Sequence, residues 1–305
     1  LILIWSADRF VIGAAGTAKN LGMSHMLIGL TVVSLGTSAP EMLVSSIAAY
    51  TEAGGLAIGN ALGSNIANIG LVLGATALIA PLPVKTGLMR KELPLLVFVT
   101  AASGLILWDG QLDRIDGVIL LVGLVCCLFL FARFQRYADP SEIQHEEEEL
   151  PDITLPKALI WLVIGLVLLA GSSRILVWGA TEIATQLGVS DLVIGLTIVA
   201  IGTSLPELAA SIASALKGHH DIAIGNVVGS NIFNLLAVMS LPGLIRPFSF
   251  DTMVLWRDFS VMMALTLLLL FFAYITSKGK INRPEGLLLL VAYSAYLGML
   301  YNMTV

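Results

Sequence analysis

Long apolar runs separated by short polar linkers dominate this sequence. Ten of them approach or exceed the about 20 residues that a helix needs to cross about 30 Å of hydrocarbon. The runs cover residues 1–19, 26–50, 56–80, 92–108, 115–132, 158–186, 192–216, 222–245, 254–276 and 285–302. Most linkers carry turn signals, such as Pro81-Leu82-Pro83. The pattern predicts an all-α polytopic membrane protein with ten transmembrane helices.

The linker between the fifth and sixth runs is longer and more polar than the others. It spans residues 133–157 and contains the acidic stretch His145-Glu146-Glu147-Glu148-Glu149. A solvated loop is the simplest interpretation of this charge run, and a regulatory cation site is the alternative. We therefore divide the chain into a first unit at 1–132, an acidic linker at 133–157 and a second unit at 158–305.

The two units repeat each other at an offset of 166 residues. At this offset residues 29–49 align with 195–215 without a gap, and 11 of the 21 pairs are identical, which indicates an internal duplication. Each unit holds five runs. Because five is odd, the second unit must enter the membrane in the opposite orientation, and we predict two inverted five-helix repeats. The same offset indicates that the first repeat lacks the start of its first helix.

Composition agrees with a membrane protein and excludes several function classes. Of the 305 residues, 57% are hydrophobic and 12% are charged, and the mean hydropathy is +0.92. Soluble domains carry about 25% charged residues. Nothing in the sequence suggests nucleic-acid binding. The adjacent cysteines Cys126 and Cys127 lack metal-ligand spacing, so we interpret them as packing residues and expect no cofactor.

The distribution of Lys and Arg predicts the orientation. With the N-terminus outside, the inside linkers hold eleven Lys and Arg residues and the outside linkers hold three. By the positive-inside rule, both termini lie outside and the acidic linker is cytoplasmic. His219 and His220 then fall in a short inside loop, where we expect them to be solvated or to tune a pH response.

A hexapeptide with a carboxylate interrupts one run in each unit. Gly36-Thr37-Ser38-Ala39-Pro40-Glu41 recurs as Gly202-Thr203-Ser204-Leu205-Pro206-Glu207. Proline removes a backbone donor and clashes with the preceding turn, so both helices should break there. An acid within a membrane span costs about 2.5–3.5 kcal/mol on insertion scales, which makes it a functional-site hypothesis by default.

The residue types around the acids are those of an oxygen-rich cation site. A second repeated motif, Gly-Asn-X-X-Gly-Ser-Asn, follows at 59–65 and 225–231. It brings Ser64 and Asn68, four residues apart on one helical face, and their equivalents Ser230 and Asn234. Carboxylates, hydroxyls and freed carbonyls are ligands for Ca²⁺, whereas histidine and thiolate are absent from the motifs. The glycines at 59, 63, 225 and 229 could instead serve only helix packing.

These paired motifs resemble the sodium/calcium exchanger branch of the cation/calcium antiporter superfamily, in a prokaryotic form. The resemblance implies a ten-helix fold with ion sites between the second, third, seventh and eighth helices, and sliding of the first and sixth helices. It implies the following ion ligands: Glu41 and Glu207 for both ions, Thr37 and Thr203 for Ca²⁺, Ser38, Ser204, Ser64 and Ser230 for Na⁺, the carbonyls of Ser34 and Ala200, and Asn68 and Asn234 lining the middle. Characterised archaeal and potassium-dependent relatives have Asp where this chain has Asn234, so a third charge is missing here and potassium independence is favoured.

The sequence therefore predicts a secondary antiporter that exchanges Ca²⁺ for Na⁺ by alternating access, in a prokaryotic inner membrane. Its partners are the lipid bilayer and the two ions, and a monomer suffices. A proton-coupled Ca²⁺ antiporter of the same fold is the first alternative, since a buried Glu can carry a proton. A cation channel is the second. A membrane hydrolase using Ser38 or Ser204 is disfavoured, because no base lies near either serine in sequence, and we expect no enzyme activity.

Charged residues within the apolar runs have more than one interpretation. Arg174 and the pair Asp8–Arg9 lie within apolar runs. All three could gate ion entry, and for Asp8 and Arg9 the simpler interpretation is that they lie near a helix end or pair locally.

Overall fold

The computed structural model describes residues 1–136, 153–188, 200–276 and 279–304, and nearly all of them are helical. In the first half of the chain the helices are α1 (Ile2–Leu21), α2 (His25–Ile28), η1 (Gly29–Val33), α3 (Ser34–Thr37), α4 (Ala39–Tyr50), α5 (Gly54–Ala67), η2 (Asn68–Leu73), α6 (Gly74–Ile79), α7 (Thr86–Arg90), α8 (Glu92–Ile106), η3 (Leu107–Asp109) and α9 (Arg114–Arg136). The second half contains α11 (Leu155–Gln186), α13 (Ala200–Thr203), α14 (Leu205–Leu216), α15 (His220–Phe233), η5 (Asn234–Val238), α16 (Ser240–Ile245), η6 (Leu255–Phe259), α17 (Ser260–Phe271), η7 (Phe272–Thr276) and α18 (Arg283–Thr304).

Seven helices of the described part are long and apolar enough to cross a membrane, and the bent pair His25–Thr37 and Ala39–Tyr50 makes eight. They match eight of the ten runs expected from the sequence. A ninth run forms α1, a helix of 20 residues that is not among these spans. The tenth, 192–216, is described only from residue 200 onward. The ten-helix arrangement and the division into units stay predictions, and most of the acidic linker lies outside the described residues.

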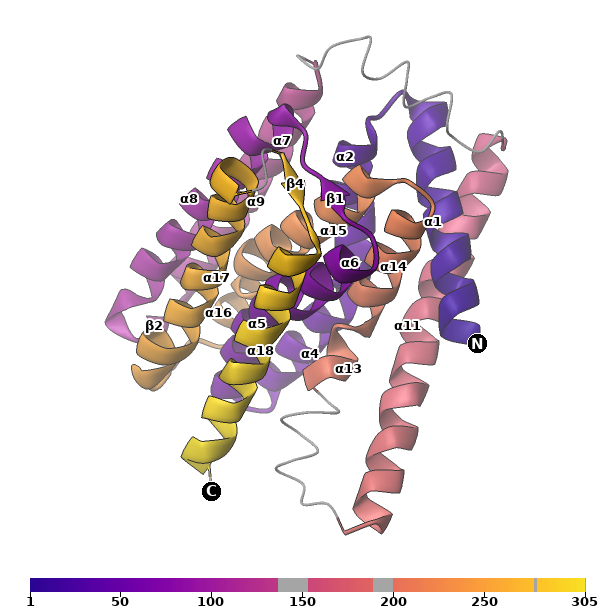
Figure 1. Ribbon diagram of the computed structural model, residues 1–305. Helices are drawn as coiled ribbons and strands as arrows, with labels where there is room; N and C mark the ends of the chain where they lie inside the picture. The colour runs from indigo at the N-terminus through magenta and orange to yellow at the C-terminus, as the bar shows by residue number, and fades with distance from the viewer. Residues whose placement is uncertain (137–152, 189–199, 277–278, 305) are drawn as a thin grey trace.

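Two short strand pairs connect the halves of the chain. β1 (Leu82–Pro83) pairs antiparallel with β4 (Lys280–Ile281), and β2 (Gln111–Leu112) pairs antiparallel with β3 (Phe248–Ser249). The first pair lies toward the upper end of the helices and β2 toward the lower end (Figure 1). The fold is therefore not purely helical. The β1–β4 pair is short because Pro83 has no N–H that could extend the ladder of hydrogen bonds.

α1 and α11 form a pair at one edge of the molecule, beside a larger body that contains α5, α15, α17 and α18 (Figure 1). Glycines bring the pair together. A Cβ added to Gly13 would lie 2.3 Å from the backbone nitrogen of Leu162, and one added to Gly165 would lie 2.5 Å from that of Phe10. Phe10, Ala14 and Leu169 of the pair belong to a small apolar cluster, separate from the main core, that also includes residues of α2, η1, α14 and α15.

The helix formed by α15, η5 and α16 is buried along its length and crosses η1 at close range. A Cβ on Gly225 would approach the Gly29 Cα to 3.1 Å, and a Cβ on Gly229 would approach the Leu30 carbonyl oxygen to 2.6 Å. The packing role predicted for the repeated glycines is confirmed at these two positions. At Gly59 and Gly63 no atom of the described residues lies within 4 Å of the added carbon.

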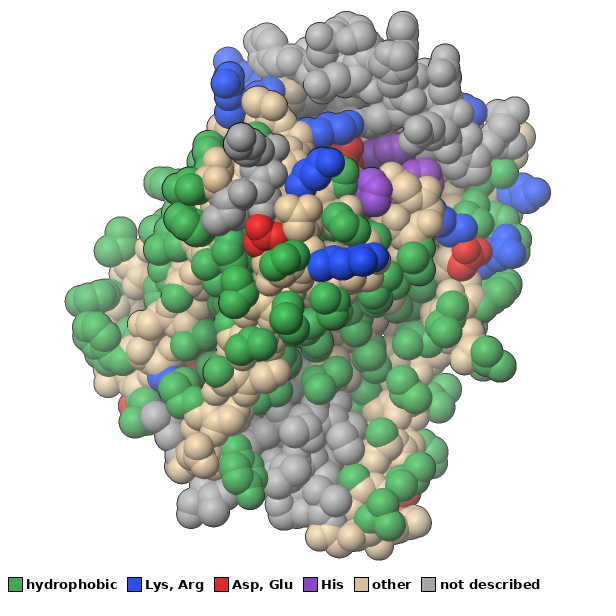
Figure 2. Space-filling view, in the orientation of Figure 1, with side chains coloured by type: hydrophobic (Ala, Val, Ile, Leu, Met, Phe, Trp, Pro, Cys, Tyr) green, Lys and Arg blue, Asp and Glu red, His purple; other side chains and the backbone are tan. Residues whose placement is uncertain are grey.

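Charged and histidine side chains connect helix ends at the upper face. Figure 2 shows basic and histidine side chains gathered there, above a broad surface of hydrophobic side chains. Lys85 Nζ lies 2.7 Å from a carboxylate oxygen of Asp221. The rings of His25 and His219 are in edge contact, with centroids 5.0 Å apart. His219 is only 7% exposed, so the prediction that it is solvated was wrong. His25 of α2 contacts the His219 ring, and the sequence did not indicate this contact because the two residues are far apart along the chain.

Adding a methyl group at the helix crossing should destabilise the fold. In Gly229→Ala the new carbon would meet backbone atoms of Leu30, which cannot rotate away, and overpacking of this kind costs about 1–3 kcal/mol. We expect a lower melting temperature in detergent, measured by fluorescence-detected size exclusion. Gly298→Ala in α18 is the matched control, since its added carbon meets nothing within 4 Å of the described atoms. Equal melting temperatures for the two variants would contradict the tight crossing.

Acidification should destabilise the protein through His219. Burial, with the nearby positive charges of His25, Lys217 and His220, lowers the pKa of His219 from 6.5 to about 4. Because the native state keeps this histidine neutral, its contribution is intact above pH 6.5 and is lost as the pH falls toward 4. The melting temperature should fall across this interval, and less steeply in His219→Gln. Parallel curves for His219→Gln and wild type would refute this origin.

Candidate ion-binding site

Two helix breaks stand where the repeated hexapeptides predicted them. At Ser38 (φ −85°, ψ 0°) the chain passes from α3 to α4, and the two segments are bent by 43°. At Ser204 (φ −90°, ψ 7°) it passes from α13 to α14. Pro40 and Pro206 both stand in the first turn after the break, where a missing N–H is tolerated. The predicted interruption of both helices is confirmed.

The two acids lie in the first turns of the helices that follow the breaks, and both are buried. Glu41 and Glu207 are each 1% exposed, and their carboxylate oxygens make no hydrogen bond within the described residues. They are close enough to interact electrostatically, and Thr37 and Ser38 approach Glu207 from the other half of the chain. Removing a carboxylate from water costs several kcal/mol unless a positive charge or a proton compensates it. The pair therefore requires such a partner.

Two asparagines hold the helices that carry the acids, and their contacts recur at the offset of 166 residues. Asn60 Nδ2 donates to the Glu41 carbonyl at 3.1 Å and to Ser45 Oγ at 2.9 Å. Asn226 Nδ2 donates to the Glu207 carbonyl at 3.3 Å and to Ser211 Oγ at 3.0 Å. These two asparagines are not among the ligands predicted from the sequence. Their place in the second repeated motif was the available signal.

Contacts between the halves bring two predicted ligands, Thr37 and Ser230, next to each other. Thr37 Oγ1 donates to the Asn226 Oδ1 at 3.1 Å, and it lies 3.4 Å from Ser230 Oγ. Asn65 Nδ2 donates to the Asn231 carbonyl at 3.2 Å. Since Thr37 belongs to α3 and both Asn226 and Ser230 belong to α15, the break in the first half faces the second motif of the other half.

Asn68 and Asn234 each begin a π-helical turn, η2 and η5. Both are 1% exposed, and none of their side-chain nitrogen and oxygen atoms has a hydrogen-bond partner within the described residues. η2 packs against α15 and η5 packs against α5. Widened turns of this type are frequent at functional sites. The sequence placed these asparagines on helices but did not predict the wider turn.

The remaining predicted ligands occupy the same segments. Ser34 is buried in α3, where its carbonyl accepts from Ser38 N at 2.9 Å and its hydroxyl donates to Leu30 O at 2.8 Å. Ser38 and Ser204 have buried hydroxyl oxygens with no hydrogen-bond partner among the described residues. Ser64 lies in α5 one turn before Asn68, and Thr203 and Ala200 belong to α13.

The buried oxygen atoms without hydrogen-bond partners are suitable ligands for a hard cation. They are carboxylate, amide and hydroxyl oxygens, the ligand types that Ca²⁺ takes in numbers of 6–8. In the described part of the chain, no three His, Cys, Asp or Glu side chains are grouped so that they could hold a metal ion. A site with two carboxylates and neutral oxygens therefore suits Ca²⁺ or Na⁺ better than zinc or copper.

Comparison with known proteins agrees with this donor chemistry. The family model described as sodium/calcium exchanger protein matches residues 1–133 and 157–302. The chain is 49% identical to the putative antiporter CaxA of Alkalimonas amylolytica, over 99% of this chain and 96% of the relative. It is 42% identical to the inner membrane protein YrbG of Escherichia coli, over 99% and 94%. It is 32% identical to the sodium/calcium exchanger MaX1 of Methanosarcina acetivorans, over 99% and 96%.

Solved structures of the sodium-calcium exchanger NCX_Mj share the fold. One of them, soaked with 10 mM Na⁺ and 10 mM Sr²⁺, superimposes with a TM-score of 0.84 at 34% identity, over 97% of this chain and 94% of that chain. The family model and the relatives span both halves of the chain and both repeated motifs. This protein is therefore a membrane transporter that belongs to the sodium/calcium exchanger family.

Proposed function

We propose that this protein exchanges Ca²⁺ for Na⁺ across the membrane and that both ions compete for one site between Glu41 and Glu207. The observation that carries the proposal is the pair of buried carboxylates without hydrogen-bond partners among the described residues. Membership of the exchanger family supports the reaction class. Two carboxylates balance the charge of one Ca²⁺, and the unpartnered hydroxyl and amide oxygens supply neutral ligands for either ion.

Shared acids explain why transport would be coupled. Two unneutralised carboxylates away from water are costly, so the carrier would reorient easily only when cations fill the site. If Ca²⁺ and Na⁺ use the same acids, loading with one excludes the other. Exchange rather than uniport follows, and the ion that moves down its gradient drives the other ion against its own.

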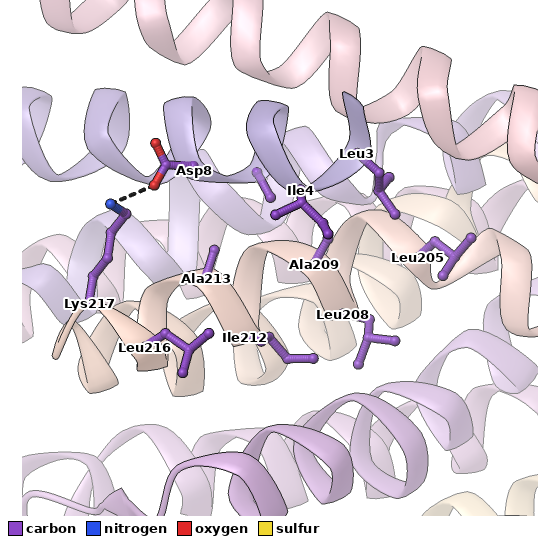
Figure 3. Close-up of a pocket in the computed structure, with 11 residues that line it drawn as sticks. Leu3, Ile4, Asp8, Leu205, Leu208, Ala209, Ile212, Ala213, Leu216 and Lys217 are labelled. Atoms are coloured by element: carbon purple, nitrogen blue, oxygen red, sulfur yellow. Dashed lines mark ion pairs between the residues drawn. The ribbon is translucent and has the colours of Figure 1, made fainter. Parts of the chain in front are cut away.

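Access to the site differs between the two halves of the chain. A cavity of about 400 Å³ between α11 and the two helix breaks is lined by Glu41 and Thr203, so it reaches predicted ligands. A groove of about 550 Å³ between α1 and α14 contains none of the predicted ligands and ends at the ion pair of Asp8 with Lys217 (Figure 3). A cavity that reaches predicted ligands in one half, and an equivalent groove that does not in the other, fit one state of an alternating-access cycle.

The recurring contacts of Asn60 and Asn226 support the inverted-repeat architecture. Equivalent linkers of the two halves also lie at opposite ends of the helices, since β1 and β3 are 166 residues apart and belong to different strand pairs. We infer that the upper face, where the basic side chains gather, is cytoplasmic and that the membrane is the inner membrane of a prokaryote. YrbG, one of the relatives, is named an inner membrane protein.

Neutralising either central acid should abolish Ca²⁺ uptake. We expect proteoliposomes loaded with Na⁺ to accumulate Ca²⁺ when Na⁺ is absent outside, and Glu41→Gln or Glu207→Gln to lower the rate to background. The matched control is Glu52→Gln, because Glu52 is an exposed acid that pairs with Arg246 away from the site.

Three versions of the gradient separate the alternatives. Uptake that requires the Na⁺ gradient supports the proposed exchange. Uptake that follows a pH gradient and ignores Na⁺ would replace Na⁺ by H⁺ as the coupling ion. Equal uptake with Na⁺ on both sides would indicate a channel and reject antiport.

Loss of the amide that holds the second acid helix should weaken Ca²⁺ binding. Asn226→Ala removes the hydrogen bonds to the Glu207 carbonyl, to Ser211 and from Thr37. Outer-shell partners of this kind change cation affinity by about 10–100-fold. The measurement is Ca²⁺ titration calorimetry on purified protein. A variant that keeps its melting temperature and binds Ca²⁺ as tightly as wild type would show that the amide does not position the site.

A further inference from the structure

Arg174 is a charged side chain within a membrane-spanning helix that the proposed exchange does not use. It lies on α11, whose 32 residues form one of the candidate spans, and its side chain is exposed. Arginine within a membrane is costly, and such residues face a bundle interior or a water-filled cavity. Arg174 lines the same cavity of about 400 Å³ as Glu41. The guanidinium and the carboxylate are close enough to interact electrostatically.

The neighbouring residue fixes this part of α11 against the second helix break. Ser173 is 3% exposed, and its hydroxyl donates to the Gly202 carbonyl at 3.1 Å. In a regular helix that carbonyl would accept from residue 206, but Pro206 has no N–H. Gly202 also has Val177 of α11 in close contact. α11 is therefore held at the break by a hydrogen bond, and Arg174 is placed in the cavity as a consequence.

The equivalent position in the first half carries the opposite charge. At the offset of 166 residues Arg174 corresponds to Asp8 of α1. Figure 3 shows Asp8 at one end of the groove between α1 and α14, where its carboxylate lies 2.6 Å from Lys217 Nζ. Asp8 is thus already paired with a cationic side chain at a groove that contains no predicted ligand. Arg174 instead places a positive charge in a cavity that reaches a central acid.

We propose that Arg174 is a specificity-determining residue, a tethered cation that competes with entering ions for Glu41 and disfavours Ca²⁺ more than Na⁺ at this entrance. The inference rests on the proposed exchange and deepens it. Coulomb repulsion scales with the charge of the ion, so a fixed positive charge raises the free energy of a divalent ion by twice as much as that of a monovalent one. The guanidinium also offsets part of the negative charge of the pair when no ion is bound.

The test is ion binding to the purified full chain in detergent. Ca²⁺ affinity is measured by titration calorimetry, and Na⁺ affinity by displacement of ⁴⁵Ca²⁺. In Arg174→Gln we expect binding to tighten by about tenfold for Ca²⁺ and about threefold for Na⁺, because the repulsion energy doubles with ion charge. Arg174→Lys should retain the wild-type affinities. Arg246→Gln is the matched control, since it removes an exposed arginine that pairs with Glu52.

Each outcome decides the inference. The expected pattern across the three variants supports it. Unchanged or weaker Ca²⁺ binding in Arg174→Gln overturns it, and so does an equal factor for both ions, which would indicate a merely structural role. If Arg174→Lys behaves like Arg174→Gln, charge is not the cause and the inference also fails. A wild-type protein that binds no Ca²⁺ would remove the proposed function as well, whereas normal wild-type binding with an unaffected Arg174→Gln would remove this inference alone.

Discussion

Two buried carboxylates at the helix breaks, close enough to interact electrostatically, are the constraint on which the rest of this structure depends. Glu41 and Glu207 have almost no exposed surface and no hydrogen-bond partner within the described residues. Most proteins avoid such a pair, because desolvation and mutual repulsion both oppose ionisation. Among the described residues, the neutral side chains of Ser38, Ser204, Asn68 and Asn234 also have oxygens without hydrogen-bond partners, so a bound cation would satisfy several groups together. A bound cation would therefore also relieve the cost of burying the two acids.

Hydrogen bonds from the scaffold hold the helices that carry these acids in place. Asn60 and Asn226 hold the two acid helices through a carbonyl and a serine hydroxyl each. The crossing of η1 over α15, which glycines make possible, keeps Thr37 against Asn226 and Ser230. Each asparagine thus supports the acid helix of its own half, and the second half also supports the break in the first half through Asn226 and Ser230. These hydrogen bonds fix the backbone beside the two acids, while the carboxylate oxygens themselves have no hydrogen-bond partner within the described residues.

The α1–α11 pair lies at one edge of the molecule, and its two helices contact the centre in different ways. α1 packs along α14, whereas α11 contacts α13, α14 and α3 and inserts Ser173 at the second break. The two halves are similar in sequence but not in the surroundings of their acids. This inequality gives one cavity that reaches Glu41 and one groove that does not reach either acid. A transporter with two accessible states needs such an inequality in each of them.

The sequence alone determined the membrane class, the position of both helix breaks and the residue types of the centre. It could do so because hydropathy, proline and a buried acid act locally, and because duplication marked the motifs twice. It could not give the roles of Asn60 and Asn226, the π-helical turns at Asn68 and Asn234, or the burial of His219 against His25. Those depend on which segments meet in space. Only the tertiary structure decided that Thr37 faces the motif of the other half. It also decided that Arg174 lines a cavity with the central acid Glu41, whereas Asp8, its equivalent in sequence, pairs with Lys217.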